Sequence, residues 1–242
     1  MRTKEFWAVM PARGNRCMTK AALDDLLAQD IGTVRPVVIV NGADDGVSPL
    51  IHTYGRSVTA LHYYPSHPGV AFAWNRGLEY AFANGAEFAF VVNNDVRLRL
   101  DMMRLLAADG GAFVTGVGVA PEDYDPTPRR PDPERRRPHP DFSGFLIRRE
   151  CWEKVGSFDE GYLGSYCEDW NYHVRMHRAG ITAISIDLPF LHYAAQTIKS
   201  QPDGGAAMSA QAERNRKRFL EQFGVEGGTE AYYALFGTGA PE

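Results

Sequence analysis

The stretch Phe88–Arg97, FAFVVNNDVR, decides how the rest of this sequence is interpreted. Its first five residues are apolar and end abruptly at Asn93, Asn94 and Asp95, a pattern typical of a buried strand with neighbours on both sides. A carboxylate just beyond the carboxyl end of such a strand lies where open α/β sheets form their ligand crevice. There Asp95 could hold a divalent cation, and the cation could hold a diphosphate. The alternative is an ordinary strand followed by an Asx turn.

Strand and helix patterns alternate on the amino-terminal side of this stretch. Strands are expected in Glu5–Pro11, Pro36–Gly46 (where the strand runs into a turn) and Ser57–Tyr64, and helices in Ala22–Asp30 and Val70–Gly85. Strands separated by helices predict right-handed crossovers and a mostly parallel sheet. The glycine spacing of a dinucleotide-binding turn is missing after the first strand, where PARGNR stands, and this disfavours an oxidoreductase.

The pattern continues on the carboxyl-terminal side. We expect a helix in Asp101–Gly110, a strand in Ala112–Ala120, a strand and short helix in Phe142–Glu160, a helix in Glu168–Gly180, two short strands in Ile181–Tyr193 and an amphipathic helix in Ala206–Gly224.

An insert rich in proline and arginine, Pro121–Asp141, interrupts these elements and is predicted to form no regular structure. A long loop of this kind inside a domain is either a solvated surface loop or a functional flap. In the second case, an arginine of the insert would reach a phosphate group; the candidates are Arg129, Arg130, Arg135, Arg136 and Arg137.

The bulk composition fits a globular protein, with 44% hydrophobic and 23% charged residues. A formal net charge of −4 gives no support to general nucleic-acid binding. Cys17, Cys151 and Cys167 are too scattered for a disulfide framework or a zinc site, which favours a reducing compartment. We expect no signal peptide, and no stretch approaches the roughly 18 apolar residues of a membrane span.

Three positions carry residues suited to catalysis: Asp95 after the central strand, Glu168 and Asp169 at a helix start, and His192 after a late strand. Carboxylate and imidazole groups could bind a divalent ion, and a carboxylate that is not a ligand could act as a general base. Each has a structural alternative, because acids favour the first turn of any helix and a histidine at a strand end is often only hydrogen-bonded. Sequence spacing does not show that the three positions meet.

The order of these segments resembles a GT-A-fold glycosyltransferase of family 2, the large group of inverting nucleotide-sugar transferases. The similarity runs from about Val9 to Gly224. The opening strand, turn and helix of the family resemble MPARGNRCMTKAALDDLLAQD, and the segment that reads the nucleotide base resembles PVVIVNGADDG. The family's helix with an Asn before a Gly resembles GVAFAWNRGLEYA, and its metal motif resembles VVNND. The most specific stretch, Phe142–Gly180, resembles the acceptor-side strand, the G-x-F-D-E connector and the helix whose Glu-Asp pair supplies the base. FLHY resembles the late segment that often gives a histidine to the metal, and RNRKRFLEQFG the closing helix.

The resemblance implies an α/β protein of the GT-A fold, with a mostly parallel central sheet, helices on both faces and a small antiparallel element on the acceptor side. It implies a single glycosyltransferase domain over residues 1–242, divided into a nucleotide-sugar-binding half (1–100), an acceptor and catalytic half (101–205) with the flexible insert 121–141, and a C-terminal helix and tail (206–242).

The resemblance also implies roles for individual residues. Asp169 would be the general base with Glu168 beside it, and Asp95 and His192 would hold Mn²⁺ or Mg²⁺. Donor-binding positions would be Pro11, Ala12, Arg13, Asn41, Asp44, Asp45, Asn75, Arg76, Asn93 and Asn94, and acceptor-side positions Gly144, Tyr162 and Trp170. Since two close carboxylates repel, one of the Glu-Asp pair is expected to have a raised pKa.

Two departures from the family pattern bear on the ligands. The metal motif often carries two acids, whereas here Asn93 and Asn94 precede a single Asp95, so metal affinity should depend on the donor's own phosphates. The second strand ends at Asn41, where many relatives place an acid that pairs with the base, which leaves Asp44 or Asp45 as substitutes. The insert has no counterpart in the pattern.

The expected donor is a UDP-, dTDP- or GDP-linked sugar. The acceptor is left open between a glycan, a protein and a lipid-linked sugar, with nucleic acid disfavoured by the acidity of the chain. The expected location is the cytoplasm, free or peripheral at a membrane surface. Two alternatives are a nucleotidyltransferase, which PARGNR with its single glycine disfavours, and a non-catalytic scaffold that binds sugar nucleotides.

Overall fold

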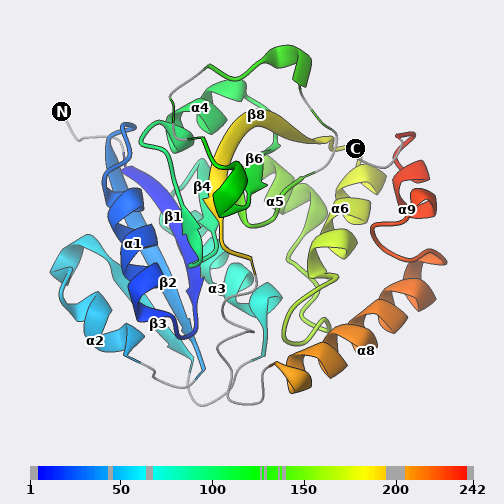
Figure 1. Cartoon of the computed structure of the whole chain (residues 1–242), viewed down its shortest axis with the longest axis horizontal. Coiled ribbons are helices and arrows are strands. Elements are labelled where there is room, and N and C mark those ends of the chain that lie inside the picture. Colours follow the sequence, from blue (N-terminus) through cyan, green and yellow to red (C-terminus); the bar gives the residue numbers. More distant parts are fainter. Residues whose placement is uncertain are drawn as a thin grey trace.

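An eight-stranded mixed sheet runs through both halves of the chain (Figure 1). The computed structural model describes residues 5–42, 46–63, 68–125, 127, 130–135, 137, 140–194 and 205–238. The strands of the sheet, in chain order, are β1 (Glu5–Ala12), β2 (Thr33–Asn41), β3 (Thr59–Tyr63), β4 (Phe88–Val92), β5 (Val96–Arg97), β6 (Phe113–Val119), β7 (Gly144–Arg148) and β8 (Ala183–His192).

The strand order is β3-β2-β1-β4-β7-β6-β8-β5. The first four strands in this order run parallel, while β7 is antiparallel to both β4 and β6. Beyond β7, β6 and β8 are parallel and β5 is antiparallel to β8. The expected fold class, mostly parallel with an antiparallel element, is therefore confirmed, and β4 joins the two parts.

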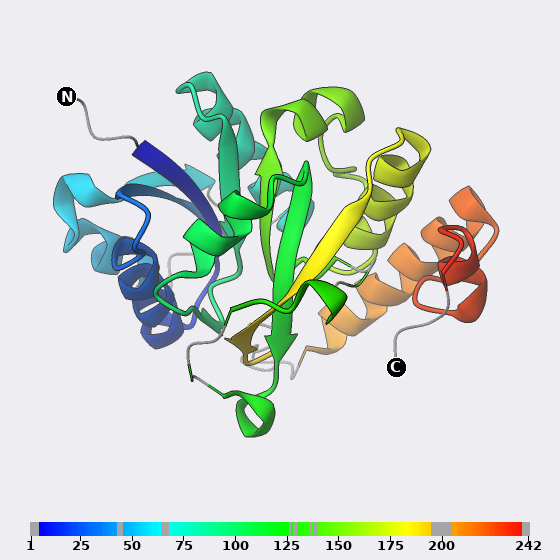
Figure 2. The same cartoon turned by 90° about the horizontal axis from the view of Figure 1, so that it is seen from above.

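Helices cover both faces of the sheet (Figure 2). One face packs against α1 (Arg16–Leu27), α2 (Val47–His52) and α4 (Met102–Asp109), and the other against α3 (Val70–Ala83), α5 (Arg149–Val155) and α6 (Glu168–Arg178). The period of two along the strands makes this possible, since Met10 and Phe90 point to one layer and Val9 and Val91 to the other. All five residues of β4 are buried, as the opening stretch predicted.

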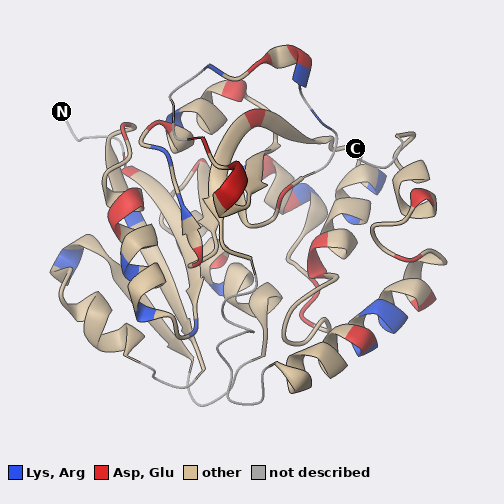
Figure 3. Cartoon of the chain, viewed as in Figure 1, with Lys and Arg blue, Asp and Glu red and all other residues tan. Residues whose placement is uncertain are grey.

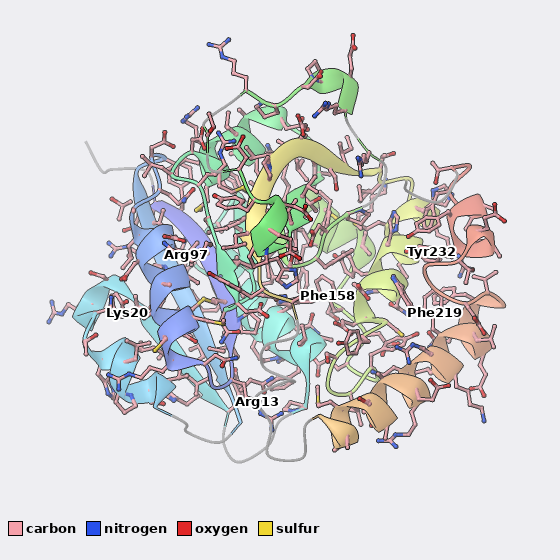
Figure 4. The ribbon with its side chains drawn as sticks, viewed as in Figure 1. Arg13, Lys20, Arg97, Phe158, Phe219 and Tyr232 are labelled. Carbon is pink, nitrogen blue, oxygen red and sulfur yellow. The ribbon has the colours of Figure 1, made fainter. Side chains whose placement is uncertain are left out.

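A third apolar cluster lies outside the sheet, where α8 (Ala206–Phe223) and α9 (Glu230–Ala234) pack against the outer side of α6. Phe219 of α8 and Tyr232 of α9 are its centre, with ring centroids 6.0 Å apart, and both are labelled in Figure 4. The short helix α9 was not expected from the sequence. None of the helices in the described residues is long and apolar enough to span a bilayer.

Two other expectations need correction. The late pair of short strands is one strand, β8, which keeps its pairing with β6 across an irregularity between Thr115 and Val117. The first helix begins at Arg16 rather than Ala22, because residues 16–21, of which Thr19 alone is buried, belong to the helix although they add little to its apolar pattern.

The insert contains two short 3₁₀ turns in its described part, Pro121–Asp123 and Pro133–Arg135. The backbone of Arg137 pairs with that of Ser185 on β8, at N···O distances of 3.0 and 2.8 Å. The guanidinium of Arg135 lies 3.8 Å from the carboxylate of Asp187. The described part of the insert is therefore attached to β8 near these residues.

Candidate active site

The candidate active site is a cavity of about 300 Å³ at the carboxyl edge of the parallel strands. The end of β1 and the turn after it form one side, where Pro11, Ala12 and Arg13 line the cavity (Arg13 is labelled in Figure 4). The carbonyl of Gly14 accepts a hydrogen bond from the Thr19 hydroxyl at 3.2 Å, so the first turns of α1 hold this turn in place.

The residues that follow β4 form the floor next to this turn. Asn93, Asn94 and Asp95 all line the cavity. The Asn94 amide donates to the Thr19 hydroxyl at 2.9 Å, and the backbone N–H of Asn93 donates to the carbonyl of Ser143 at 2.9 Å. Asn94 thus secures the β1 turn, while Asn93 connects the floor to the strand pair β4–β7.

Asp95 and His192 are brought together by the pairing of β5 with β8. Val96 lies opposite His192 in this antiparallel pair, and the backbone N–H of Tyr193 donates to the carbonyl of Asp95 at 3.0 Å. As a result, His192 Nε2 lies 3.6 Å from Asp95 Oδ1. Burial alone would lower the pKa of His192, but its contact with Asp95 and the negative charges of Asp95 and Asp141 raise that pKa above the ordinary value.

Asp95 and His192 would form a small ligand set if a divalent ion bound at this position. Among the described residues, no group of three or more histidine, cysteine or acidic side chains is arranged to hold a metal. One carboxylate and one imidazole fit Mn²⁺ or Mg²⁺, which accept oxygen and imidazole ligands, provided that phosphate oxygens and water fill the remaining positions. The residues present therefore fit a metal that binds together with a diphosphate.

Glu168 and Asp169 enter the cavity from the first turn of α6, which appears as the acidic end of that helix in Figure 3. Burial, and then the charge of Asp169, raise the pKa of Glu168 well above its usual 4.5. Burial also raises the pKa of Asp169, but its carboxylate accepts a hydrogen bond from the backbone N–H of Trp170 at 2.8 Å, which favours the charged form. Asp169 therefore ionises first, and Glu168 keeps its proton to higher pH.

Four buried polar atoms that lack a hydrogen-bond partner belong to residues lining this cavity. They are Asn41 Oδ1, Trp74 Nε1, Ser165 Oγ and Glu168 Oε2. Buried polar groups are almost always paired, so these four atoms leave hydrogen-bonding capacity unused in the walls of the cavity. The set holds both donors and acceptors.

Sequence reasoning missed several residues that line the cavity, above all Asp141 and Trp74. Asp141 accepts hydrogen bonds from the backbone N–H groups of Gly118 at 2.7 Å and Ser143 at 2.9 Å. The bond to Ser143 is an Asx turn, so an Asp two residues before a Ser at a strand start was an available signal. Trp74 gave no signal, since an aromatic residue in a helix pattern is usually core.

Five of the expected site residues do not line the cavity. The side chain of Asn75 bonds both backbone groups of Phe158, and Arg76 pairs with acids at 2.8 and 2.9 Å. Gly144 in β7 lies against the ring of Phe190 in β8. The Tyr162 hydroxyl donates to Gln222 at 2.6 Å, and Trp170 packs against the third apolar cluster, with α8 and α9. Asp44 and Asp45 lie outside the described residues.

The arginines of the insert are also absent from the described cavity lining. Arg130, Arg135 and Arg137 are exposed and do not line this cavity, whereas Arg129 and Arg136 lie outside the described residues. Among the described residues, Arg13 is the lining residue with a permanent positive charge.

Several solved structures share this arrangement of strands and helices. The mannosyltransferase PcManGT from Pyrobaculum calidifontis, in complex with GDP-Man and Mn²⁺, matches 96% of this chain and 67% of its own, with a TM-score of 0.61 and 13% identity. TarS from S. aureus in complex with UDP-GlcNAc matches 90% of this chain and 73% of its own, with a TM-score of 0.56 and 10% identity. The longer S. aureus TarS structure gives a TM-score of 0.63 at 12% identity, over 96% of this chain and 42% of that one.

The chain has the GT-A fold. At these identities the likeness establishes the fold alone. No protein-family model matches the sequence, and comparison with curated proteins found no similar sequence. The GT-A fold expected from the order of the motifs is thus confirmed by structure, and the roles of the individual residues rest on the geometry of the cavity.

Proposed function

We propose that this chain is a metal-dependent, inverting glycosyltransferase that moves a sugar from a nucleoside-diphosphate donor to an acceptor hydroxyl. One observation carries the proposal. A GT-A fold places Asp95 and His192 beside Glu168 and Asp169 in one cavity, together with buried polar atoms that lack partners. The cavity volume of about 300 Å³ is at the lower end of small-molecule sites and suits part of a nucleotide-sugar.

Each residue has a role that its surroundings favour. Asp169 is proposed as the general base for the acceptor hydroxyl, since it is the member of the acidic pair that ionises first. Asp95 and His192 are proposed to hold Mn²⁺ or Mg²⁺, which when bound would stabilise the charge of the leaving diphosphate. Arg13 is proposed to contact the donor phosphates, and Asn41, Asn93 and Asn94 the donor.

The electrostatics of the cavity support the need for a metal. Its described lining holds four acids, Asp95, Asp141, Glu168 and Asp169, against Arg13 and His192. A diphosphate brings further negative charge, so a bound divalent cation would make the site far more favourable for it. This balance also disfavours a nucleotidyltransferase, which needs several cationic groups around a triphosphate.

The donor is proposed to be a GDP-, UDP- or dTDP-linked sugar, since structures with the same fold contain GDP-Man and UDP-GlcNAc. The test is a thermal-shift screen of these three donor classes with and without Mn²⁺, followed by donor turnover in the presence of candidate acceptors. A ligand that binds the native state raises the melting temperature by mass action. We expect one donor class to stabilise the protein only when Mn²⁺ is present, and to be turned over with inversion.

The outcomes separate the proposals. Stabilisation without turnover on any acceptor would favour the non-catalytic scaffold. Stabilisation by nucleoside triphosphates rather than by nucleotide-sugars would favour nucleotidyl transfer. If neither ligand class raises the melting temperature, with or without the metal, the proposed function is wrong.

A further inference from the structure

The segment that leads into α6 has an unusual backbone. Tyr166 and Cys167 have φ angles of 78° and 73°, two consecutive non-glycine residues in the left-handed region. This conformation is strained for L-residues and persists only where the surroundings enforce it. Glu168 and Asp169 follow at once, so the strained backbone fixes the direction in which both carboxylates leave the helix.

Asn215 of α8 holds the backbone of this segment on one side. Its side-chain amide Nδ2 lies 2.9, 3.0 and 3.1 Å from the backbone carbonyls of Leu163, Ser165 and Tyr166, so its two N–H groups are shared among three acceptors. Asn215 is 1% exposed, so these bonds are shielded from water. Gln211 donates to Asn215 Oδ1 at 2.9 Å, which fixes the orientation of the amide.

The opposite side of the segment is held by the start of α3. Gly164 forms a bridge with Gly69, and its carbonyl accepts a hydrogen bond from Val70 N at 2.7 Å. A Cβ on Gly69 would lie 2.7 Å from Gly164 N, so the two backbones are in direct contact. Asn41 at the end of β2 donates to the Gly69 carbonyl at 2.8 Å. The segment is therefore held between the start of α3, which Asn41 of β2 fixes in turn, and α8.

Ser165 and Glu168, in and next to this segment, line the cavity. Ser165 Oγ and Glu168 Oε2 are buried and lack partners, and Tyr166 lines the same cavity. Without Asn215, three carbonyls would lose their donor, and the left-handed residues could relax to ordinary φ angles. Relaxation would redirect Glu168 and Asp169.

We propose that Asn215 is a positioning residue for the reaction: it holds residues 163–167 in the strained conformation that aims Ser165, Glu168 and Asp169 into the cavity. The inference rests on the proposed function. It makes α8, about fifty residues beyond the acidic pair in the sequence, a working part of the site. Asn215 touches neither substrate nor reacting atoms in this proposal.

The test compares Asn215→Ala with a control on the same helix, Glu213→Ala, whose exposed carboxylate pairs with the exposed guanidinium of Arg216 at 3.1 Å. We expect Asn215→Ala to lower kcat at least tenfold, to change the donor KM less than threefold, and to shift the acidic limb of the kcat–pH profile. Glu213→Ala should leave all three unchanged.

A second substitution separates positioning from general packing. Glycine adopts a φ of 73° without strain, so Cys167→Gly should restore part of the lost kcat in the Asn215→Ala background. If Asn215 only contributed packing, removing the buried Cys167 side chain would lower kcat further. Should Asn215→Ala fail to fold, Asn215→Gln with and without Cys167→Gly is judged by the same criterion.

Amide hydrogen exchange gives a readout that needs no turnover. Exchange in residues 163–169 should rise in Asn215→Ala and stay unchanged in Glu213→Ala. If the unsubstituted protein turns over no donor, the proposed function fails whatever the exchange shows. If it turns over a donor but Asn215→Ala keeps its kcat and pH profile, the positioning role is wrong even where exchange rises.

Discussion

At the scale of single residues, the two neighbouring acids of α6 differ because their surroundings differ. Asp169 accepts backbone hydrogen bonds at the start of the helix, whereas one oxygen of Glu168 is buried without a partner. We expected one of the two acids to have a raised pKa. The pKa of both is raised by burial, and the rise is larger for Glu168. The sequence could not make this assignment, because both acids sit in the same helical turn.

Asp169→Asn tests the proposed base. The amide keeps the size of the side chain but cannot take a proton, so turnover should fall by about 10²–10⁴-fold. Donor binding in the presence of Mn²⁺ should change little, because the proposed metal ligands lie elsewhere: Asp95 between β4 and β5, and His192 at the end of β8. Steady-state kinetics together with a donor-binding titration provide the check, and unchanged turnover would reject Asp169 as the base.

Glu168→Gln tests the burial of the second acid through stability. A carboxyl whose pKa is raised in the folded state binds more protons than in the unfolded state, so stability falls as pH rises above its usual 4.5. The Gln variant escapes this loss and should be more stable at pH 7. A gain of about 1 kcal/mol would raise the melting temperature by roughly 2–4 °C.

The pH dependence of that gain is the decisive feature. Below the usual pKa of 4.5 the glutamate is protonated in both states, so the difference between the variant and the original protein should vanish there. Thermal unfolding at pH 7 and near pH 4 measures it. A difference that is the same at both values would mean that the charge of Glu168 is not the cause.

At the scale of elements, the Asn-Arg-Gly sequence in α3 has a packing role. Asn75 binds the backbone of Phe158 across the molecule, with Phe158 N donating at 2.8 Å and Asn75 Nδ2 donating at 3.0 Å. Gly77 lets α3 approach β1, since a Cβ there would lie 2.2 Å from Val9 Cγ1. The family resemblance placed Asn75 and Arg76 at the donor, but a helix pattern does not show which neighbour each side meets.

Gly77→Ala should therefore destabilise the protein, by about 1–3 kcal/mol as for other overpacked cores. Gly77→Ala combined with Val9→Ala should recover part of that loss, because it removes the methyl group that the new Cβ meets. Denaturant unfolding of the single and double variants gives the coupling. Gly85→Ala, in open space at the left-handed position that follows α3, separates steric overlap from backbone strain.

The C-terminal elements show a second limit of pattern reading. The closing helix was expected and is present as α8, but its contacts were not readable. Asn215 and Gln222 lie on a helix that looks like a charged surface element, with Arg, Lys and Glu along it in Figure 3. Asparagine and glutamine are both common on solvated helices. Only their burial in the folded protein shows that Asn215 and Gln222 make interior contacts rather than surface ones.

At the scale of the whole molecule, the three cysteine thiols differ in their exposure to solvent. Cys17 is exposed, while Cys151 and Cys167 are buried and none is in a disulfide. Burial raises the pKa of Cys151 and of Cys167 to about 12, so neither forms a reactive thiolate near neutrality.

Thiol labelling should therefore modify one cysteine in the native protein and all three after denaturation. Intact-mass analysis after reaction with an alkylating reagent counts them, and peptide analysis should place the native label on Cys17. Rapid labelling of Cys167 in the native state would show that the segment before α6 opens readily. Added Mn²⁺ and donor should leave the labelling of Cys17 unchanged, since Cys17 does not line the cavity.

The sequence by itself determined the sheet layers and the carboxyl edge where the polar residues gather. Alternating apolar residues and strand-end polar groups are local properties, and Asp95, Asp169 and His192 could be singled out from them. Only the tertiary structure decided which of these meet. The β5–β8 pairing brings His192 to Asp95, the loop before α6 brings Asp169 and Glu168 to one cavity with Trp74 and Asp141, and Asn75 and Tyr162 are turned into other contacts. The physical reason is that such meetings depend on strand register and on contacts between residues far apart in the chain, which no local periodicity records.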